Sequence, residues 1–115
     1  MSIHFIRDRI SRTDLQKIAD ERFGDMVKAV VDLTRRVMTL GGELHADEES
    51  EMLEQGSIRE DLWGINLYPG EKGDAFIEYD SMINIRPALG NRTRSIDDEM
   101  VRAKIRKFVD DMITD

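Results

Sequence analysis

Apolar residues recur at helical spacing over the first third of the chain. Ser11, with Asp14 three positions later, has the pattern of a helix N-cap before an apolar face. A second apolar stripe runs through residues 26–40 and stops at Gly41 and Gly42. The pattern therefore predicts a short strand at residues 3–6, a first helix from Ser11 and a central helix over residues 26–40.

The spacing changes to alternation between residues 62 and 86, which predicts a β-hairpin. Its first arm has one apolar phase, formed by Trp63, Ile65 and Leu67. The turn over residues 69–73 leads into a longer second arm, whose inward phase is Ile77, Tyr79, Ile83 and Ile85. A brief acidic helix over residues 47–55 precedes the hairpin, and Ser95 with Asp98 begins a last amphipathic helix.

These elements predict a single α+β domain over residues 1–115. We expect helices packed on one face of a small antiparallel sheet, a hairpin with a long second strand, and a C-terminal amphipathic helix. The length of 115 residues suits one hydrophobic core. No repeat and no linker-like segment marks a boundary within the chain.

Charge and composition narrow the classes of function. The chain has 24 Asp and Glu against 17 Lys and Arg, a net charge of -7, so nucleic acid is not the expected partner. The absence of Cys excludes disulfides, thiolate metal sites and Cys nucleophiles. The N-terminus has no signal-peptide pattern, and no apolar run approaches the roughly 20 residues of a membrane span. We therefore expect a cytoplasmic protein that does not bind membranes.

The second arm of the hairpin predicts a polar row on the outward face of the sheet. Its members are Phe76, Glu78, Asp80, Met82, Asn84 and Arg86, beside Asn66 and Tyr68 of the first arm. One interpretation is a solvated sheet face with stabilising cross-strand pairs. The other is a surface for a ligand or a partner, which the two outward apolar side chains favour. A second copy of the chain is one such partner.

His45 lies in the most acidic part of the sequence. Eight acids occur between Glu43 and Asp61, with Arg59 as the only Lys or Arg, so we expect carboxylates to favour the protonated imidazole. Three interpretations stay open: a metal ligand in a Glu43-x-His45-x-Asp47 alternation, a catalytic His45, and a structural His45 bonded to a carboxylate. Because no second histidine is near in sequence, we predict no metal site and no cofactor.

A basic loop precedes the last helix. Residues 86–94 hold Arg86, Arg92 and Arg94 and no acid, a composition that suits recognition of a phosphate or carboxylate. The alternative is that these arginines pair with the acidic stretch within the same chain. The sequence has no Gly-x-Gly-x-x-Gly and no Gly-Lys-Ser/Thr, which excludes a dinucleotide fold and a P-loop.

Four blocks of sequence together resemble a small prokaryotic protein family carried as a domain of unknown function. The blocks are residues 21–32, 41–48, 61–69 and 80–87, and the resemblance covers roughly residues 10–110. It implies no activity, substrate or catalytic residue. A weaker likeness, in the order of elements alone, is to the RelE/ParE-like toxins, which are usually basic whereas this chain is acidic.

The residues favour a binding or regulatory module, with a homo-oligomer expected, that meets a protein partner or a small anionic ligand. The residues expected to bind are Asn66, Tyr68, Asn84, Arg86, Arg92 and Arg94. The alternative is a small hydrolase or nuclease-like enzyme in which His45 is the general acid or base, Glu78 or Asp80 orients it and Arg86 stabilises negative charge. A third hypothesis is a purely structural subunit. Whether the protein is an enzyme stays open at this stage.

Overall fold

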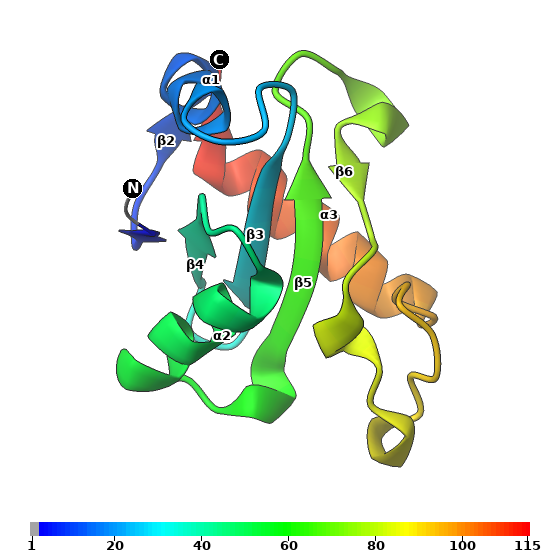
Figure 1. The fold of residues 1–115 in the computed structure, drawn as a ribbon. Coiled ribbons are helices and arrows are strands. Elements are labelled where there is room, and N and C mark those ends of the chain that lie inside the picture. The colour runs from blue at the N-terminus through cyan, green and yellow to red at the C-terminus, as the bar shows by residue number, and fades with distance from the viewer. Residues whose placement is uncertain (1–2) are drawn as a thin grey trace.

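The computed structural model describes residues 3–115, and its centre is a five-stranded antiparallel sheet (Figure 1). The strand order is β1-β4-β3-β5-β6. The strands are β1 (His4–Ile6), β3 (Val27–Asp32), β4 (Val37–Leu40), β5 (Leu62–Leu67) and β6 (Ile77–Glu78). The helices are α1 (Arg12–Asp20), α2 (His45–Glu54) and α3 (Glu99–Met112). The predicted α+β class, antiparallel sheet and C-terminal amphipathic helix are confirmed.

Shorter elements connect and complete this framework. Two short strands, β2 (Ile10–Ser11) and β7 (Ile113–Thr114), form a separate parallel pair. Four single-turn 3₁₀ helices lie in the connections: η1 (Arg59–Asp61), η2 (Gly73–Ala75), η3 (Met82–Asn84) and η4 (Pro87–Leu89). In the part of the chain that the structure describes, no helix is long and apolar enough to cross a membrane.

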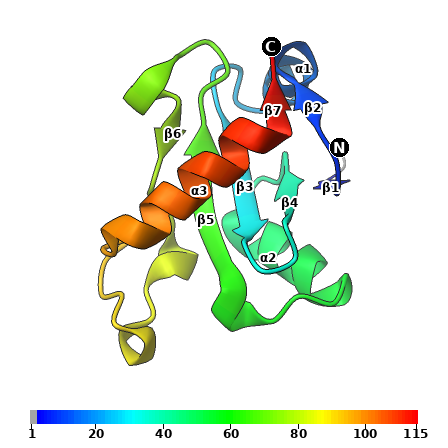
Figure 2. The ribbon, with the colours of Figure 1, turned by 180° about the vertical axis from the view of Figure 1, so that it is seen from behind.

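The helices cover both faces of the sheet. In Figure 1, α2 lies in front of β3 and β4, and Figure 2, which views the molecule from behind, shows α3 crossing in front of β3 and β5 on the opposite face of the sheet. Ala29 and Val31 of β3 pack in the cluster that contains α1 and α3, whereas Val30 between them packs with Met52 of α2. The prediction that the helices pack on one face of the sheet is therefore wrong. Because β3 has buried side chains on both faces, each face needs a helix to cover it.

The predicted central helix over residues 26–40 is wrong, because this segment is the hairpin of β3 and β4. Its register places Val30 opposite Thr39 and Asp32 opposite Val37. The Asp32 carboxylate accepts the backbone N–H groups of Thr34 and Arg35, both at 3.0 Å, which holds the turn. Valines buried on both sides of a strand show no alternation, so their spacing also fits a helical stripe.

The predicted long second strand is also different in the structure. Only Ile77 and Glu78 pair with β5, and the chain then leaves the sheet. The side chain of Asn84 takes the place of a strand: its Oδ1 accepts the Gly64 N–H at 2.8 Å, and its Nδ2 donates to the Gly64 carbonyl at 2.9 Å. Gly64 leaves room for this segment, because a Cβ there would lie 2.6 Å from Ser81.

Helix caps were easier to predict than strands. Ser11 caps α1 by accepting the Asp14 N–H at 3.1 Å, as predicted. Asp98, rather than Ser95, caps α3 by accepting the Met100 N–H at 2.8 Å. The acidic helix begins at His45, two residues before its predicted start.

Candidate ligand pocket at the N-terminus of α2

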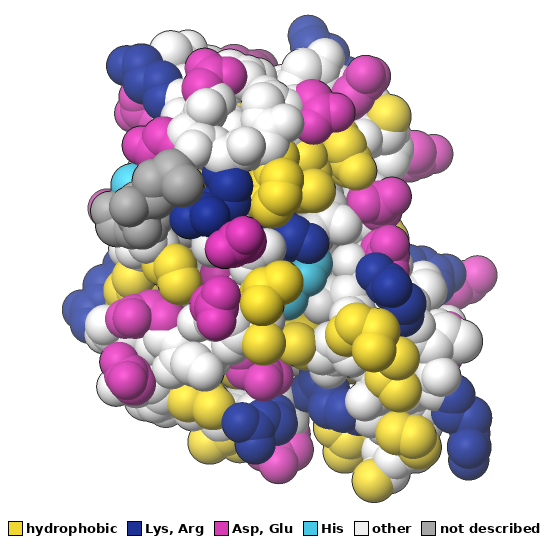
Figure 3. All heavy atoms as spheres, viewed as in Figure 1, with side chains coloured by type: hydrophobic (Ala, Val, Ile, Leu, Met, Phe, Trp, Pro, Cys, Tyr) yellow, Lys and Arg dark blue, Asp and Glu magenta, His cyan; other side chains and the backbone are white. Residues whose placement is uncertain are grey.

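The α2 face of the sheet is only partly covered. Beyond the first residue of α2, Lys28 and Asn66 lie opposite each other on β3 and β5, with Glu78 next in register on β6. A pocket of about 280 Å³ opens here. It is lined by Lys28, Leu44, His45, Ala46, Ser81, Met82, Ile83 and Arg94. In the view of Figure 3, hydrophobic and basic side chains gather around a histidine on this face.

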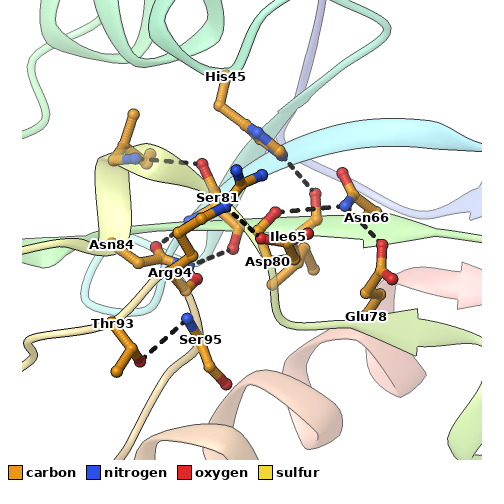
Figure 4. A network of polar contacts seen from close by, with 12 residues as sticks. His45, Ile65, Asn66, Glu78, Asp80, Ser81, Asn84, Thr93, Arg94 and Ser95 are labelled. Atoms are coloured by element: carbon orange, nitrogen blue, oxygen red, sulfur yellow. Dashed lines mark hydrogen bonds and ion pairs between the residues drawn. The ribbon is translucent and has the colours of Figure 1, made fainter.

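His45 is the first residue of α2 and reaches down to β5 (Figure 4). Its Nε2 lies 2.8 Å from the Ile65 carbonyl oxygen. A carbonyl only accepts hydrogen bonds, so Nε2 carries the proton and donates it. Burial lowers the pKa of His45; Lys28 and Arg94 lower it further, while the bond to Ile65 and the charge of Asp80 raise it. The imidazole is therefore neutral near pH 7, with its lone pair on Nδ1.

Two expectations for His45 are corrected by this geometry. Neighbouring carboxylates were expected to favour its protonated form, but desolvation is the largest influence and favours the neutral one. A structural histidine was expected to bond a carboxylate, but its partner is the backbone carbonyl of Ile65. Nδ1 makes no hydrogen bond with any residue from 3 to 115 and is the ring nitrogen left for a ligand.

The α2 N-terminus has no side-chain cap. Leu44 occupies the N-cap position, where its side chain is 56% exposed and bonds no backbone amide. Within the described chain, the N–H groups of His45 and Ala46 make no hydrogen bond. A helix N-terminus carries a partial positive charge, and unpaired amides at this end favour an anion.

Two basic side chains share the pocket with these amides. Lys28 forms no ion pair within residues 3–115 and lies over the ring of Phe23 at 5.6 Å. Arg94 donates from Nε to Asp80 at 2.7 Å, and both side chains are partly exposed. The Arg94 carbonyl accepts the Ser81 N–H at 2.9 Å and the Asn84 amide at 3.0 Å, which fixes its backbone.

A polar triad lies beside the pocket on β5 and β6. One oxygen of Glu78 accepts from Asn66 Nδ2 at 2.8 Å and from the Tyr68 hydroxyl at 3.0 Å. Burial raises the pKa of Tyr68, and its bond to Glu78 raises it further. The Oδ1 of Asn66 is buried and has no partner among the described residues. Asn66 and Glu78 therefore lie next to Asp80 and Arg94 (Figure 4), and Tyr68 joins them through its bond to Glu78.

The other predicted binding residues lie elsewhere. Asn84 is fully buried, where its amide holds Gly64, so its predicted outward placement is wrong. Arg86 donates to the carbonyls of Arg59 and Leu62, and its guanidinium lies 4.7 Å from the centre of the Trp63 ring.

Two further placements concern the predicted basic loop and the predicted polar row. Arg92 is exposed, and within residues 3–115 its guanidinium makes no hydrogen bond or ion pair. Phe76, also expected outward, is buried in the core.

The metal alternative loses its geometric basis. Glu43, His45 and Asp47 were considered as three ligands on one strand face, but His45 begins a helix, where such spacing does not share a face. Among the residues that the structure describes, no three His, Asp or Glu side chains are grouped to hold a metal ion.

Several pocket residues were not found from the sequence. Lys28 was hidden because residues 26–40 were interpreted as a helix, whose faces differ from those of β3. Ser81 and the uncapped Leu44 carry no motif. One feature of the sequence could have indicated Lys28: it is a single lysine within a valine-rich run. As a strand residue it shares a face with Val30 and Asp32.

The fold and pocket define a small α+β protein with an open, partly basic site at a helix N-terminus. The chain belongs to the family described as Protein of unknown function (DUF5674), whose family model matches residues 4–112. The resemblance to a family of unknown function is thereby confirmed, whereas the likeness to RelE/ParE-like toxins gains no support. Neither the curated proteins nor the solved structures contain a match to the chain.

Proposed function

We propose that the protein is a binding module for a small anionic ligand, held in the pocket at the N-terminus of α2. The observation that carries this proposal is the meeting, in one pocket, of Lys28, Arg94 and the unbonded amides of His45 and Ala46. These groups come from β3, from the loop after η4 and from α2. Side chains held by separate packed elements favour a preorganised site.

The charges around the pocket support an anion of modest size. Asp80 offsets part of the charge of Arg94, while Lys28 has no carboxylate partner among residues 3–115. Lys28, the two amides and the Nη groups of Arg94 thus have unused donor capacity. The volume of about 280 Å³ suits a molecule of a few heavy atoms with one or two charges.

Titration with inorganic phosphate and with acetate, followed by amide NMR shifts, tests this proposal. We expect saturable shifts at His45 and Ala46, and about tenfold weaker binding in Lys28→Ala, because one nearby charge contributes on the order of 1–4 kcal/mol. Lys104→Ala, an exposed lysine on α3, is the matched control and should bind as the wild type does. Equal loss in both variants, or no shifts at α2, contradicts the proposal.

A protein partner is a second candidate for the same surface. Leu44 and Met82 line the pocket and are 56% and 64% exposed, an unusual pairing of apolar side chains beside charged ones. A second copy of the chain would cover them. Native mass spectrometry of the wild type and of Leu44→Ser with Met82→Ser decides this: a dimer lost in the double variant supports it, and a monomer in both opposes it.

The hydrolase alternative draws its support from one feature, the neutral His45 with a free Nδ1 lone pair. The carboxylates do not orient this ring: Asp80 pairs with Arg94, and Glu78 bonds Asn66 and Tyr68. Ile65 takes that role instead. Turnover of p-nitrophenyl acetate or phosphate that disappears in His45→Gln would favour an enzyme over a binding module.

A further inference from the structure

We propose that His45 sets the class of ligand: the pocket selects an anion that carries a hydrogen-bond donor next to its charge, as in an α-hydroxy carboxylate. This inference rests on the proposed function and names its ligand class. It follows from the two nitrogen atoms of the His45 ring: Nε2 is bonded to the Ile65 carbonyl, whereas Nδ1 has no partner among the described residues.

The first step is the fixed tautomer. Nε2 donates to the Ile65 carbonyl at 2.8 Å, and a carbonyl cannot return a proton. His45 is buried, with 7% of the residue exposed, and its ring is neutral near pH 7. Nδ1 can therefore only accept a hydrogen bond in the pocket.

The second step is the conflict between a lone pair and a bare anion. A carboxylate drawn in by Lys28 and the α2 amides would bring its own lone pairs toward Nδ1, which offers no donor in return. A hydroxyl on the neighbouring carbon of the ligand removes this conflict, because it donates to Nδ1 while the carboxylate meets the amides. Sites that bond a ligand hydroxyl discriminate strongly against the analogue that lacks it, because the protein atom is left unpaired.

The third step is the position of His45 within the helix. Its ring and the unbonded amides of His45 and Ala46 belong to the same first turn of α2. Donor and anion must then be only a few atoms apart in the ligand. The rim residues Leu44 and Met82 allow a short apolar substituent. Glycolate and lactate have this chemistry, and acetate and propionate are the matched analogues without the donor.

The experiment compares glycolate with acetate, and lactate with propionate, by amide NMR titration at pH 7.5. We expect each hydroxy acid to bind at least tenfold more tightly than its analogue. In His45→Gln, a side-chain amide can still donate to Ile65 but leaves no ring nitrogen at the Nδ1 position, so the ratio should fall to about one.

A pH series on the wild type gives a readout that does not depend on a folded variant. The charged groups that act on the His45 ring are Lys28 of β3, Asp80 after β6 and Arg94 after η4. Glycolate and acetate both stay mostly ionised between pH 7.5 and 5.5. Protonation of Nδ1 turns it into a donor, so the preference for glycolate over acetate should shrink as the pH falls through the lowered pKa of His45.

The outcomes separate this inference from the proposed function. Equal binding of glycolate and acetate at pH 7.5, or a preference that stays constant while the His45 ring itself protonates, overturns the role of Nδ1 but leaves an anion pocket. Binding of neither acid, together with no phosphate binding, overturns the proposed function itself.

Discussion

The two faces of the central sheet differ in what they bury. The face toward α1 and α3 is one continuous apolar cluster that includes Leu15, Ile65 and Phe108. The face toward α2 has a small apolar cluster of Val30, Val37, Met52 and Leu62, surrounded by polar groups. Those buried polar residues include Asp32, Thr39, His45, Glu48, Asn66 and Asn84. One face therefore supplies most of the hydrophobic stabilisation, and the other holds the groups that position the pocket.

Glu48 is a buried carboxyl with one unpaired oxygen on the α2 face. It is fully buried three residues after His45, and its Oε2 accepts the Gly42 N–H at 2.9 Å. Its Oε1 is buried without a partner among the described residues. Burial raises the pKa of Glu48 well above its usual value, with smaller opposite influences from Gly42 and Lys28. The carboxyl is a destabilising feature that the apolar face must offset.

The largest expected effect comes from the apolar face. Phe108 is fully buried on α3, and Phe108→Ala should lower the free energy of unfolding by about 3–5 kcal/mol through lost burial and a cavity. Urea denaturation followed by circular dichroism measures this. Met100→Ala on the same helix, where the side chain is 69% exposed, is the control and should change little. If Phe108→Ala loses no more unfolding free energy than Met100→Ala, the apolar face is not the main source of hydrophobic stabilisation.

A smaller loss is expected on the polar face. Asn84→Ala leaves the buried N–H and C=O of Gly64 without partners, at about 1–3 kcal/mol for the unpaired groups. Hydrogen exchange at the Gly64 amide should speed up together with the loss of stability. Arg92→Ala, in the same loop but exposed, should leave both quantities unchanged. If Asn84→Ala behaves like Arg92→Ala, the side chain does not hold the loop on β5.

The smallest effect sharpens the comparison through pH. The pKa of Glu48 is raised on folding, so the folded state binds more protons above pH 4.5, and stability is lost as the pH rises through the folded pKa. Glu48→Gln removes this loss, so the variant should gain stability over the wild type between pH 5 and pH 8. Parallel urea titrations at both pH values give the difference, and a constant difference would argue against a strongly raised pKa.

His45 acts in the opposite direction on the same helix. Its pKa is lowered on folding, so the unfolded state binds more protons just below pH 6.5, and stability is lost as the pH falls through that region. Because Glu48→Gln is compared with the wild type at each pH, the contribution of His45 to the free energy of unfolding is the same in both proteins and cancels. The remaining difference is the contribution of Glu48.

Local signals in the sequence predicted the parts of the fold that depend on local contacts. The cap at Ser11, the amphipathic face of α3 and the shared phase of Trp63, Ile65 and Leu67 were correct, because each depends on residues a few positions apart. The hairpin of β3 and β4 was missed because burial on both sides hides its period.

The candidate site was predictable in its residues but not in its arrangement. His45, Asp80 and Arg94 were named from the sequence, and the structure brings them to one region. Their roles depend on distant partners: Ile65 bonds His45, and Gly64 takes the amide of Asn84. Contacts between residues about 20 positions apart leave no periodic trace in a sequence.

The parallel pairing of β2 with β7 joins an early and a late segment of the fold. Ile10 pairs with Ile113 and Ser11 with Thr114, so segments about a hundred residues apart become neighbours. At a synthesis rate of roughly 5–20 residues per second, β2 leaves the ribosome on the order of ten seconds before its partner. The sheet can form earlier, but without α3 its apolar face stays open to water and to other chains. Synthesis order thus leaves this apolar face without its α3 cover after α2 has become available to cover the other face.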